Sequence, residues 1–348
     1  MRHRRRPWSR PITDMILTEV RGEPASIVTS GLLVVGSGMA FSQDLTQAYI
    51  PTAFDPDLDI TQEEVIRTLV RVSEGDETRF RFRHPPEVVA HLMRDAVPLN
   101  LLHPANYFHF LVEALPSLLS LIAQDALGRN AMLVSGLLHP NMWQALRYAT
   151  QRTPLPITQL QPFQAVTSDR VILPTPSWHA TELRAGGVSK SAFDAGNIAL
   201  LRKAFQPLWA DVPAPQRIKV FIRRPAAHRA LSNAPEIEAL AVAAGYRIVD
   251  PGRMPLLDQI RTFSAASHIA GPTGAWAANL VFANDAKVTV LYPQTCAVEG
   301  ENLWGALGRI CGLDMREAYG PVTRLLPQMP LHSDFMIPPE VFTAQLAA

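Results

Sequence analysis

Cysteine is almost absent from this 348-residue chain, which contains only Cys296 and Cys311. Two cysteines supply neither a disulfide framework nor a set of zinc ligands, so we expect small buried thiols in a reducing cytosol. No apolar run approaches about 18 residues, which argues against a membrane-spanning helix. Lysine is also scarce, and the net charge of +1 gives no general attraction to nucleic acid.

The chain begins with a basic segment, Met1–Trp8, that is rich in arginine. No apolar core follows it, which argues against a secretory signal. We therefore expect a solvated, disordered tail on a cytoplasmic protein. The same segment could also make a peripheral contact with an anionic surface such as the inner membrane.

The length suits two domains, and the Pro-rich stretch 211–216 is the best candidate linker. This predicts an N-terminal α/β domain over 1–210 and a C-terminal Rossmann-like domain over 211–348, whose last segment could pack back on the first. In the first domain, strands are predicted at 15–20, 31–35, 97–102, 131–134 and 170–173, and helices from about 106, at 142–148 and at 197–209. Alternating strands and helices predict a mostly parallel sheet.

The C-terminal half alternates more clearly. Strands are predicted at 217–222, 246–249, 267–270 and 287–292, and helices from 235, at 255–266 and at 302–311. This pattern predicts a doubly wound unit of about four parallel strands, in which ligands bind beyond the carboxyl ends of the strands. Arg223, Arg224 and the turn at 271–274 all follow such ends.

The turn Gly271-Pro272-Thr273-Gly274 leads from a strand into an apolar helix that reaches Phe282. Such a turn leaves backbone N–H groups unpaired, and together with the helix dipole they form an anion site. A tight turn that binds nothing is the alternative. Guanidinium groups beside a helix N-terminus suit a pyrophosphate, so we favour phosphate or nucleotide binding.

A second candidate site lies on the helix that starts near Asn106. Asn106, His109 and Glu113 are spaced i, i+3 and i+7, which places them on one helix face. The Glu113 carboxylate could orient the His109 imidazole as a general base requires. The alternative, favoured on spacing alone, is an ordinary His–Glu pair on a half-buried helix. Pro116 should kink this helix near Val112.

Two other patterns are weaker. The Asp-x-Asp run at 55–59 is similar to the metal clamp of some sugar transferases, but a turn into a helix with Thr61 and Glu64 as a capping box is favoured. We therefore expect no metal site and no cofactor. The Gly-Ser-Gly sequence at 36–38 lacks the third glycine of a dinucleotide fingerprint, because Phe41 stands there.

Four motifs follow one another in an order that resembles a known family. They are Asn-Tyr-Phe-His-Phe-Leu-Val-Glu at 106–113, the strand ending in Arg223-Arg224 with Arg229 and Asn233 after it, the turn 271–275 with Asn279, and Asp334-Phe335 before Pro338-Pro339. The family is glycosyltransferase family 61, often described as capsular polysaccharide biosynthesis proteins. The resemblance covers about residues 97 to 345.

The resemblance implies two Rossmann-like domains facing each other, in the GT-B arrangement. It also implies inverting transfer, with no required metal, from a nucleotide sugar, usually a UDP-sugar, held mainly by the second domain. His109 or Glu113 would be the base for the acceptor hydroxyl. Arg224, Arg229 and the turn would hold the diphosphate, and the nucleotide-sugar site would also include Asn106, Arg223, Asn233, Gly271, Pro272, Thr273, Gly274 and Asn279. Within that set, the two asparagines at 233 and 279 are expected to fix backbone more than to touch substrate.

Three positions depart from the family pattern, which commonly has His at Thr273 and Glu at Ala234 and Val290. Glu299 or Glu301 could replace the last of these carboxylates. The leading hypothesis is a bacterial transferase that acts on a glycan or lipid-linked glycan in capsular, exo- or lipopolysaccharide synthesis. The departures motivate a second hypothesis, a non-catalytic sugar- or nucleotide-binding scaffold. The missing glycine fingerprint argues against a third, a Rossmann-type oxidoreductase.

Overall fold

The computed structural model describes residues 16–20, 25–35, 39–51, 69–74, 77–99, 106–175, 178–181, 190–210, 217–224, 229–297, 302–327 and 332–347. The basic start, the 36–38 and 55–59 patterns, the 211–216 linker, Glu299 and Glu301 lie outside the described residues. The chain divides into two compact units, Met1–Ser177 and Trp178–Ala348, which are described separately. The division falls before the predicted 210/211 boundary because helix α5 (Ala195–Phe205) packs in the second unit, where Arg202 Nη1 donates to Val281 O at 2.7 Å.

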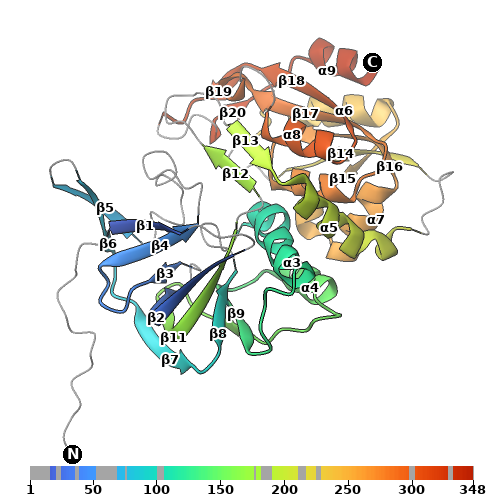
Figure 1. Ribbon diagram of the computed structural model, residues 1–348. Helices are drawn as coiled ribbons and strands as arrows, with labels where there is room; N and C mark the ends of the chain where they lie inside the picture. Colours follow the sequence, from blue (N-terminus) through green and yellow to red (C-terminus); the bar gives the residue numbers. More distant parts are fainter. Residues whose placement is uncertain are drawn as a thin grey trace, which may run out of the picture. The chain divides into compact units, whose positions relative to one another are not determined.

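The first unit is built on a nine-stranded sheet (Figure 1). Its strand order is β1 (Ile16–Val20), β4 (Gln47–Pro51), β3 (Ala40–Phe41), β2 (Ala25–Val35), β11 (Gln164–Pro174), β8 (Asp95–Pro98), β9 (Ala131–Ser135) and β10 (Ile157–Gln159), and β7 (Glu87–Leu92) also pairs with β11. A separate hairpin joins β5 (Leu69–Glu74) to β6 (Glu77–Phe82).

The predicted α/β class is confirmed, but the sheet of the first unit is mixed rather than mostly parallel. The eleven-residue strands β2 and β11 pair antiparallel, whereas β7 and β8 pair parallel to β11. The strands β8, β9 and β10 pair parallel to one another, so the chain must cross over between them. The helices α2 (Tyr107–His109), the π-helix η2 (Phe110–Ala114) and α3 (Leu115–Ala123) lie in the connection from β8 to β9, and α4 (Pro140–Ala149) lies in the connection from β9 to β10.

The second unit has a parallel sheet, as its strand–helix alternation predicted, with five strands where about four were expected. Its order is β15 (Tyr246–Val249), β14 (Ile218–Ile222), β16 (Ala266–Pro272), β17 (Lys287–Pro293) and β18 (Asp314–Gly320). Two hairpin-like pairs accompany it: β12 (Trp178–Thr181) with β13 (Lys190–Phe193), and β19 (Val322–Arg324) with β20 (Asp334–Phe335).

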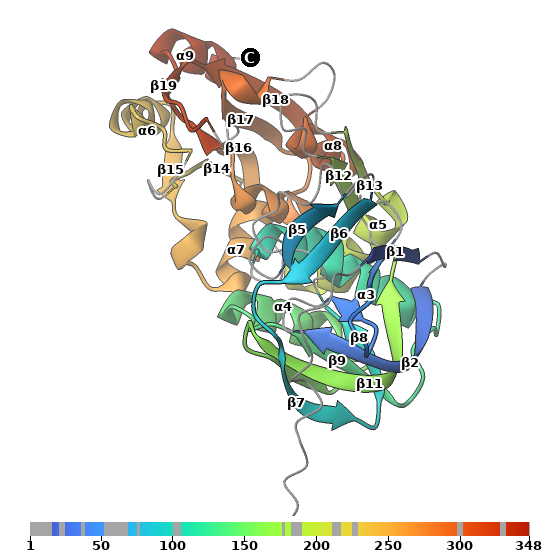
Figure 2. The same ribbon diagram turned by 90° about the vertical axis from the view of Figure 1, so that its left-hand side faces the viewer.

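Helices cover both faces of this sheet. Figure 2 shows α6 (Ala234–Ala243) and α9 (Pro339–Ala347) on one side, and α5 and α8 (Leu303–Ile310) on the other. Phe221, Leu291 and Phe342 are buried together beneath α6 and α9. The unit also contains α7 (Leu256–Ser264) and the 3₁₀ helix η6 (Ala275–Phe282). Among the described residues, no helix is both long and apolar enough to span a bilayer.

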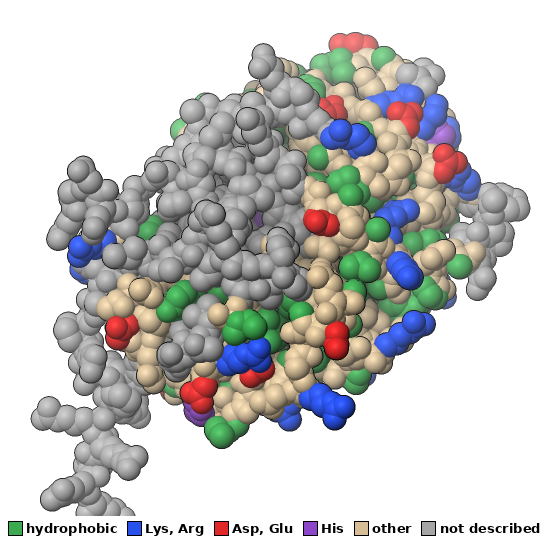
Figure 3. Space-filling view, in the orientation of Figure 1, with side chains coloured by type: hydrophobic (Ala, Val, Ile, Leu, Met, Phe, Trp, Pro, Cys, Tyr) green, Lys and Arg blue, Asp and Glu red, His purple; other side chains and the backbone are tan. Residues whose placement is uncertain are grey.

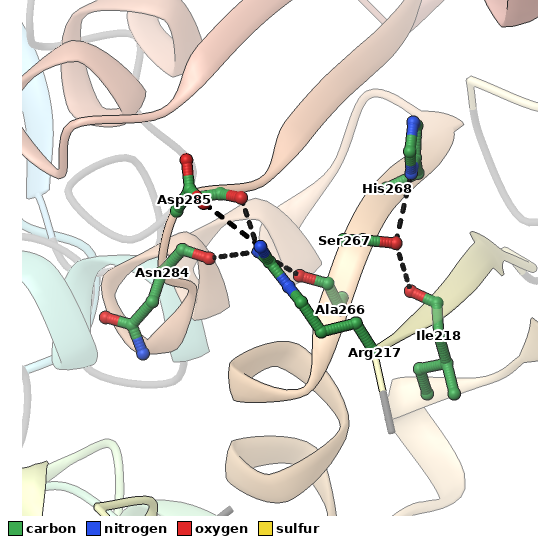
Figure 4. Close-up of polar contacts among 7 residues, drawn as sticks. All are labelled: Arg217, Ile218, Ala266, Ser267, His268, Asn284 and Asp285. Carbon is green, nitrogen blue, oxygen red and sulfur yellow. Dashed lines mark hydrogen bonds and ion pairs between the residues drawn. The ribbon is translucent and has the colours of Figure 1, made fainter. Parts of the chain in front are cut away.

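Arg217 ties together the amino ends of three strands of this sheet (Figure 4). Its Nη2 donates to the carbonyl oxygens of Asn284 at 2.7 Å and Ala266 at 3.3 Å, and its Nη1 pairs with Asp285 at 3.0 Å. The end of the sheet opposite to the predicted ligand end is therefore fixed by one guanidinium. Where Figure 3 colours the surface, acidic and basic side chains are interspersed.

Candidate active site

The helix that carries His109 changes geometry where the sequence predicted a kink. Asn106 caps its start by accepting a hydrogen bond from Phe108 N at 2.9 Å. The chain then widens into the π-helix η2 before the α-helical geometry resumes in α3. Pro116 cannot donate an N–H to the preceding turn, which explains a local loss of α-helical bonding here. π-Helical turns occur often at functional sites.

This helix turns its apolar side into the first unit and keeps His109 and Glu113 at the edge of the core. Leu111, Leu115 and Leu118 are all buried. His109 Nδ1 lies 2.9 Å from Glu113 Oε2, and the two side chains are only 11% and 16% exposed. A carboxylate at this distance fixes the orientation of the imidazole ring. The predicted pair therefore exists in a partly desolvated setting.

In the second unit, the two consecutive arginines after β14 have different environments. Arg223 is 55% exposed and pairs with Glu238 of α6, with Nε to Oε1 at 2.9 Å. Arg224 is half-buried, and its Nη1 donates to the carbonyl oxygen of Thr273. Successive side chains of an extended strand point to opposite sides, which explains the difference. Of the two, Arg224 is the one that reaches the glycine turn.

Arg224 carries a positive charge that no carboxylate balances among the described residues. Burial, and then the nearby Arg229, lower the pKa of its guanidinium to about 9. Arg224 is therefore still protonated at neutral pH, although its charged form is less stable than that of an arginine in water. An anion bound beside these two arginines would offset both causes of the shift, desolvation and like-charge repulsion.

The turn at 271–274 differs from the prediction in its hydrogen bonding. Thr273 N–H donates to Leu291 O at 2.8 Å, so this amide belongs to the sheet and is not available to an anion. The helix that follows is 3₁₀ rather than α-helical. Thr273 is therefore not one of the unpaired N–H groups that the sequence predicted for this turn, and the two arginines supply the full positive charges beside it.

The two glycines of the turn are needed for space. A Cβ on Gly271 would lie 2.7 Å from Ile222 Cβ, so β14 and β16 could not approach as they do. A Cβ on Gly274 would lie 3.1 Å from Arg224 Nη1. Both glycines therefore permit a close approach, to the backbone and side chain of Ile222 at Gly271 and to the Arg224 guanidinium at Gly274. Pro272, between them, accepts from Trp276 Nε1 at 2.5 Å.

The two asparagines of the motif set hold backbone and side chains of the scaffold. Asn233 donates to Ile337 O at 2.9 Å and accepts from Ile337 N at 3.2 Å. Asn279 is fully buried and donates to Gln259 Oε1 at 2.7 Å. Asn233 thus holds backbone that is distant in the sequence, and Asn279 holds a buried side chain.

Trp304 was not predicted as part of this region. Its Nε1 donates to Thr273 Oγ1 at 2.9 Å, from a helix that begins some 30 residues further along the chain. No local pattern in the sequence connects the two residues, because the contact depends on how α8 packs over the sheet. Within the described part of the chain, no cluster of His, Cys, Asp and Glu could hold a metal ion.

The fold is of the α/β class, and the family of the chain follows from its sequence. It belongs to the glycosyltransferase 61 family, whose model matches residues 107–291, just over half of the chain. One solved structure that it resembles is the dodecameric iron-containing heptosyltransferase TibC in complex with ADP-D-beta-D-heptose, at 12% identity, over 84% of this chain and 80% of that chain, with a TM-score of 0.31. No curated protein matches.

Proposed function

We propose that this glycosyltransferase transfers a sugar, with inversion and without a required metal, from a nucleotide donor, UDP-linked by preference, to a glycan or lipid-linked glycan. Capsular, exo- or lipopolysaccharide synthesis at the cytoplasmic side of a bacterial inner membrane is the proposed setting. A GT-B-type arrangement remains part of this proposal, with the all-parallel sheet of the second unit as its Rossmann-like domain and the mixed sheet of the first unit as a departure from that pattern. Family membership leaves no support for the oxidoreductase alternative.

The observation that carries the proposal is the unbalanced charge of Arg224 beside Arg229. A departing nucleoside diphosphate develops negative charge, and fixed guanidinium groups stabilise such charge most strongly where water is partly excluded. Arg224 is tethered to Thr273 O and faces Gly274, so its position is set before a ligand arrives. We assign Arg224 and Arg229 to the diphosphate, with the turn backbone beside them.

The proposed base is His109, oriented by Glu113. A single displacement requires that the acceptor hydroxyl lose a proton as it attacks the donor carbon. With Nδ1 held by the carboxylate at 2.9 Å, Nε2 is the atom that would take this proton. Glu113 would stabilise the imidazolium that results. The test is turnover: His109→Ala should abolish it, and Glu113→Gln should lower it by about 10- to 100-fold while folding is retained.

A non-catalytic scaffold is the second candidate, and one observation favours it. Val290, at a place where the family commonly has Glu, is completely buried, so it offers no group to a ligand. Thr273 also uses its hydroxyl to accept from Trp304. If a protein that binds UDP transfers no donor sugar, the scaffold is the better assignment. If His109→Ala leaves turnover at the wild-type level, the enzyme stands and the assignment of His109 as the base is wrong.

The binding test is calorimetric titration with UDP, with and without magnesium. Arg224→Gln should weaken UDP binding by about tenfold or more, the equivalent of a lost charge-assisted contact. Arg223→Gln is the matched control, because the neighbouring guanidinium is already paired with Glu238. Binding that requires magnesium, or binding that Arg224→Gln leaves unchanged, would contradict the proposal.

A further inference from the structure

Arg229 occupies a backbone conformation that side chains normally avoid. Its φ is +52°, in the left-handed region, where a Cβ crowds the following carbonyl oxygen. Such residues persist only where the surrounding structure imposes the conformation, and they cluster at functional sites. The structure must therefore contain contacts that hold this residue in place.

Those contacts come from a segment about 100 residues further along the chain. Arg229 N donates to His332 O at 3.0 Å, and Phe335 N donates to Ala230 O at 3.0 Å. Phe335 is completely buried in the core beneath α6 and α9. The backbone around Arg229 is thus tied to a strand, β20, that is anchored in the interior of the second unit.

Asp334, also in β20, holds the same stretch of backbone through its side chain. Its Oδ1 accepts the N–H of Ala230, the residue directly after Arg229, at 2.9 Å. Its Oδ2 lies 2.7 Å from Nε of Arg324, and the Asp334 side chain is only 11% exposed. A buried carboxylate held on both oxygens has a fixed position, so it fixes the peptide that follows Arg229.

We propose that Asp334 is a positioning residue for the donor site: it imposes the left-handed conformation of Arg229 and so directs that guanidinium toward Arg224. The inference rests on the proposed function in that Arg229 is taken to bind the diphosphate. It also gives the Asp-Phe motif near the end of the chain a role. Asp334 acts through Arg229 and need not touch the ligand.

The test combines Asp334→Ala and Asp334→Asn with Arg229→Gly and Arg229→Gln, using UDP titration and thermal unfolding of the full chain. Asp334→Ala should weaken UDP binding by about tenfold in the otherwise wild-type protein. When Arg229→Gln is already present, adding Asp334→Ala should cause no further loss of UDP affinity. Asp334→Asn should stay close to wild type, since its amide oxygen can still accept from Ala230. Arg324→Gln, which leaves the carboxylate in place, is the control for the ion pair.

Thermal unfolding gives a readout that does not depend on nucleotide. Glycine tolerates a positive φ, so Arg229→Gly should be more stable than Arg229→Gln, and this difference should vanish with Asp334→Ala. If Asp334→Ala alone fails to fold, rescue by Arg229→Gly supports the inference and lack of rescue overturns it. The inference is also overturned if the stability difference between Arg229→Gly and Arg229→Gln persists in the Asp334→Ala background. It is overturned as well if Asp334→Ala weakens UDP binding equally in the wild-type and the Arg229→Gln proteins. A wild-type protein that binds no nucleotide would contradict the proposed function, and the thermal difference would still decide the role of Asp334.

Discussion

Replacing Arg229 with glycine should separate the stability of the second unit from its ability to bind a nucleotide. A side chain at φ +52° costs about 1–2 kcal/mol relative to an ordinary conformation. Glycine removes this cost but loses about 0.5–1 kcal/mol more backbone entropy on folding. Arg229→Gly should therefore be more stable than Arg229→Gln by roughly 0.5–1 kcal/mol, which is about 1–4 °C in Tm for a unit of this size.

Glutamine is the matched comparison because it removes the same charge and keeps a side chain at the strained position. Both variants also relieve the repulsion of Arg224 that lowers its pKa, so this effect cancels between them. Differential scanning calorimetry gives the Tm values, and UDP titration gives the affinities. We expect both variants to lose UDP affinity to a similar extent. Equal Tm values would refute the reasoning about strain, and wild-type affinity in either variant would refute the assignment of Arg229 to the diphosphate.

Three further predictions concern other parts of the second unit and the glycines. Gly274→Ala should displace the Arg224 guanidinium and weaken UDP binding several-fold in calorimetry, whereas Gly128→Ala, whose Cβ would meet only a carboxylate oxygen at 3.8 Å, should not. Gly271→Ala should lower the free energy of unfolding in urea by about 1–3 kcal/mol through overpacking, and an unchanged midpoint would contradict the close approach. Burial, aided by nearby cations, lowers the pKa of His268 below 6.5, so the folded state gains protons less readily. Stability should fall as pH drops through 6.5, and His268→Gln should flatten this dependence in thermal melts between pH 5.5 and 7.5.

Elements with a strong local pattern could be predicted from the sequence. The strand–turn–helix order around Gly271 and the His109–Glu113 spacing both depend on residues close together in the chain, and the structure contains both. Strand β18 could not be predicted, because its residues are mostly polar and the strand is only partly buried. The antiparallel pairing of β2 with β11 was missed for another reason: it joins strands more than 100 residues apart, and no local pattern specifies such a partner.

The candidate site shows the same limit at the level of single side chains. The sequence placed Arg223 and Arg224 together at the end of a strand, but it could not assign Arg223 to Glu238 or Arg224 to the turn. That assignment depends on which side of the sheet α6 covers, and so on tertiary packing. Trp304 was missed for the same reason.

The departures from the family pattern bear unequally on activity. At Thr273 the atom that holds Arg224 is the backbone carbonyl oxygen, which any residue type would supply. This chain has threonine where the family commonly has histidine. The exchange removes the imidazole but leaves Arg224 held by the backbone carbonyl. Val290 is buried within the sheet and Ala234 begins α6, so their side chains lie in structural settings. The residues proposed to act on charge and protons, Arg224, Arg229, His109 and Glu113, are all present. Their presence favours the enzyme over the scaffold.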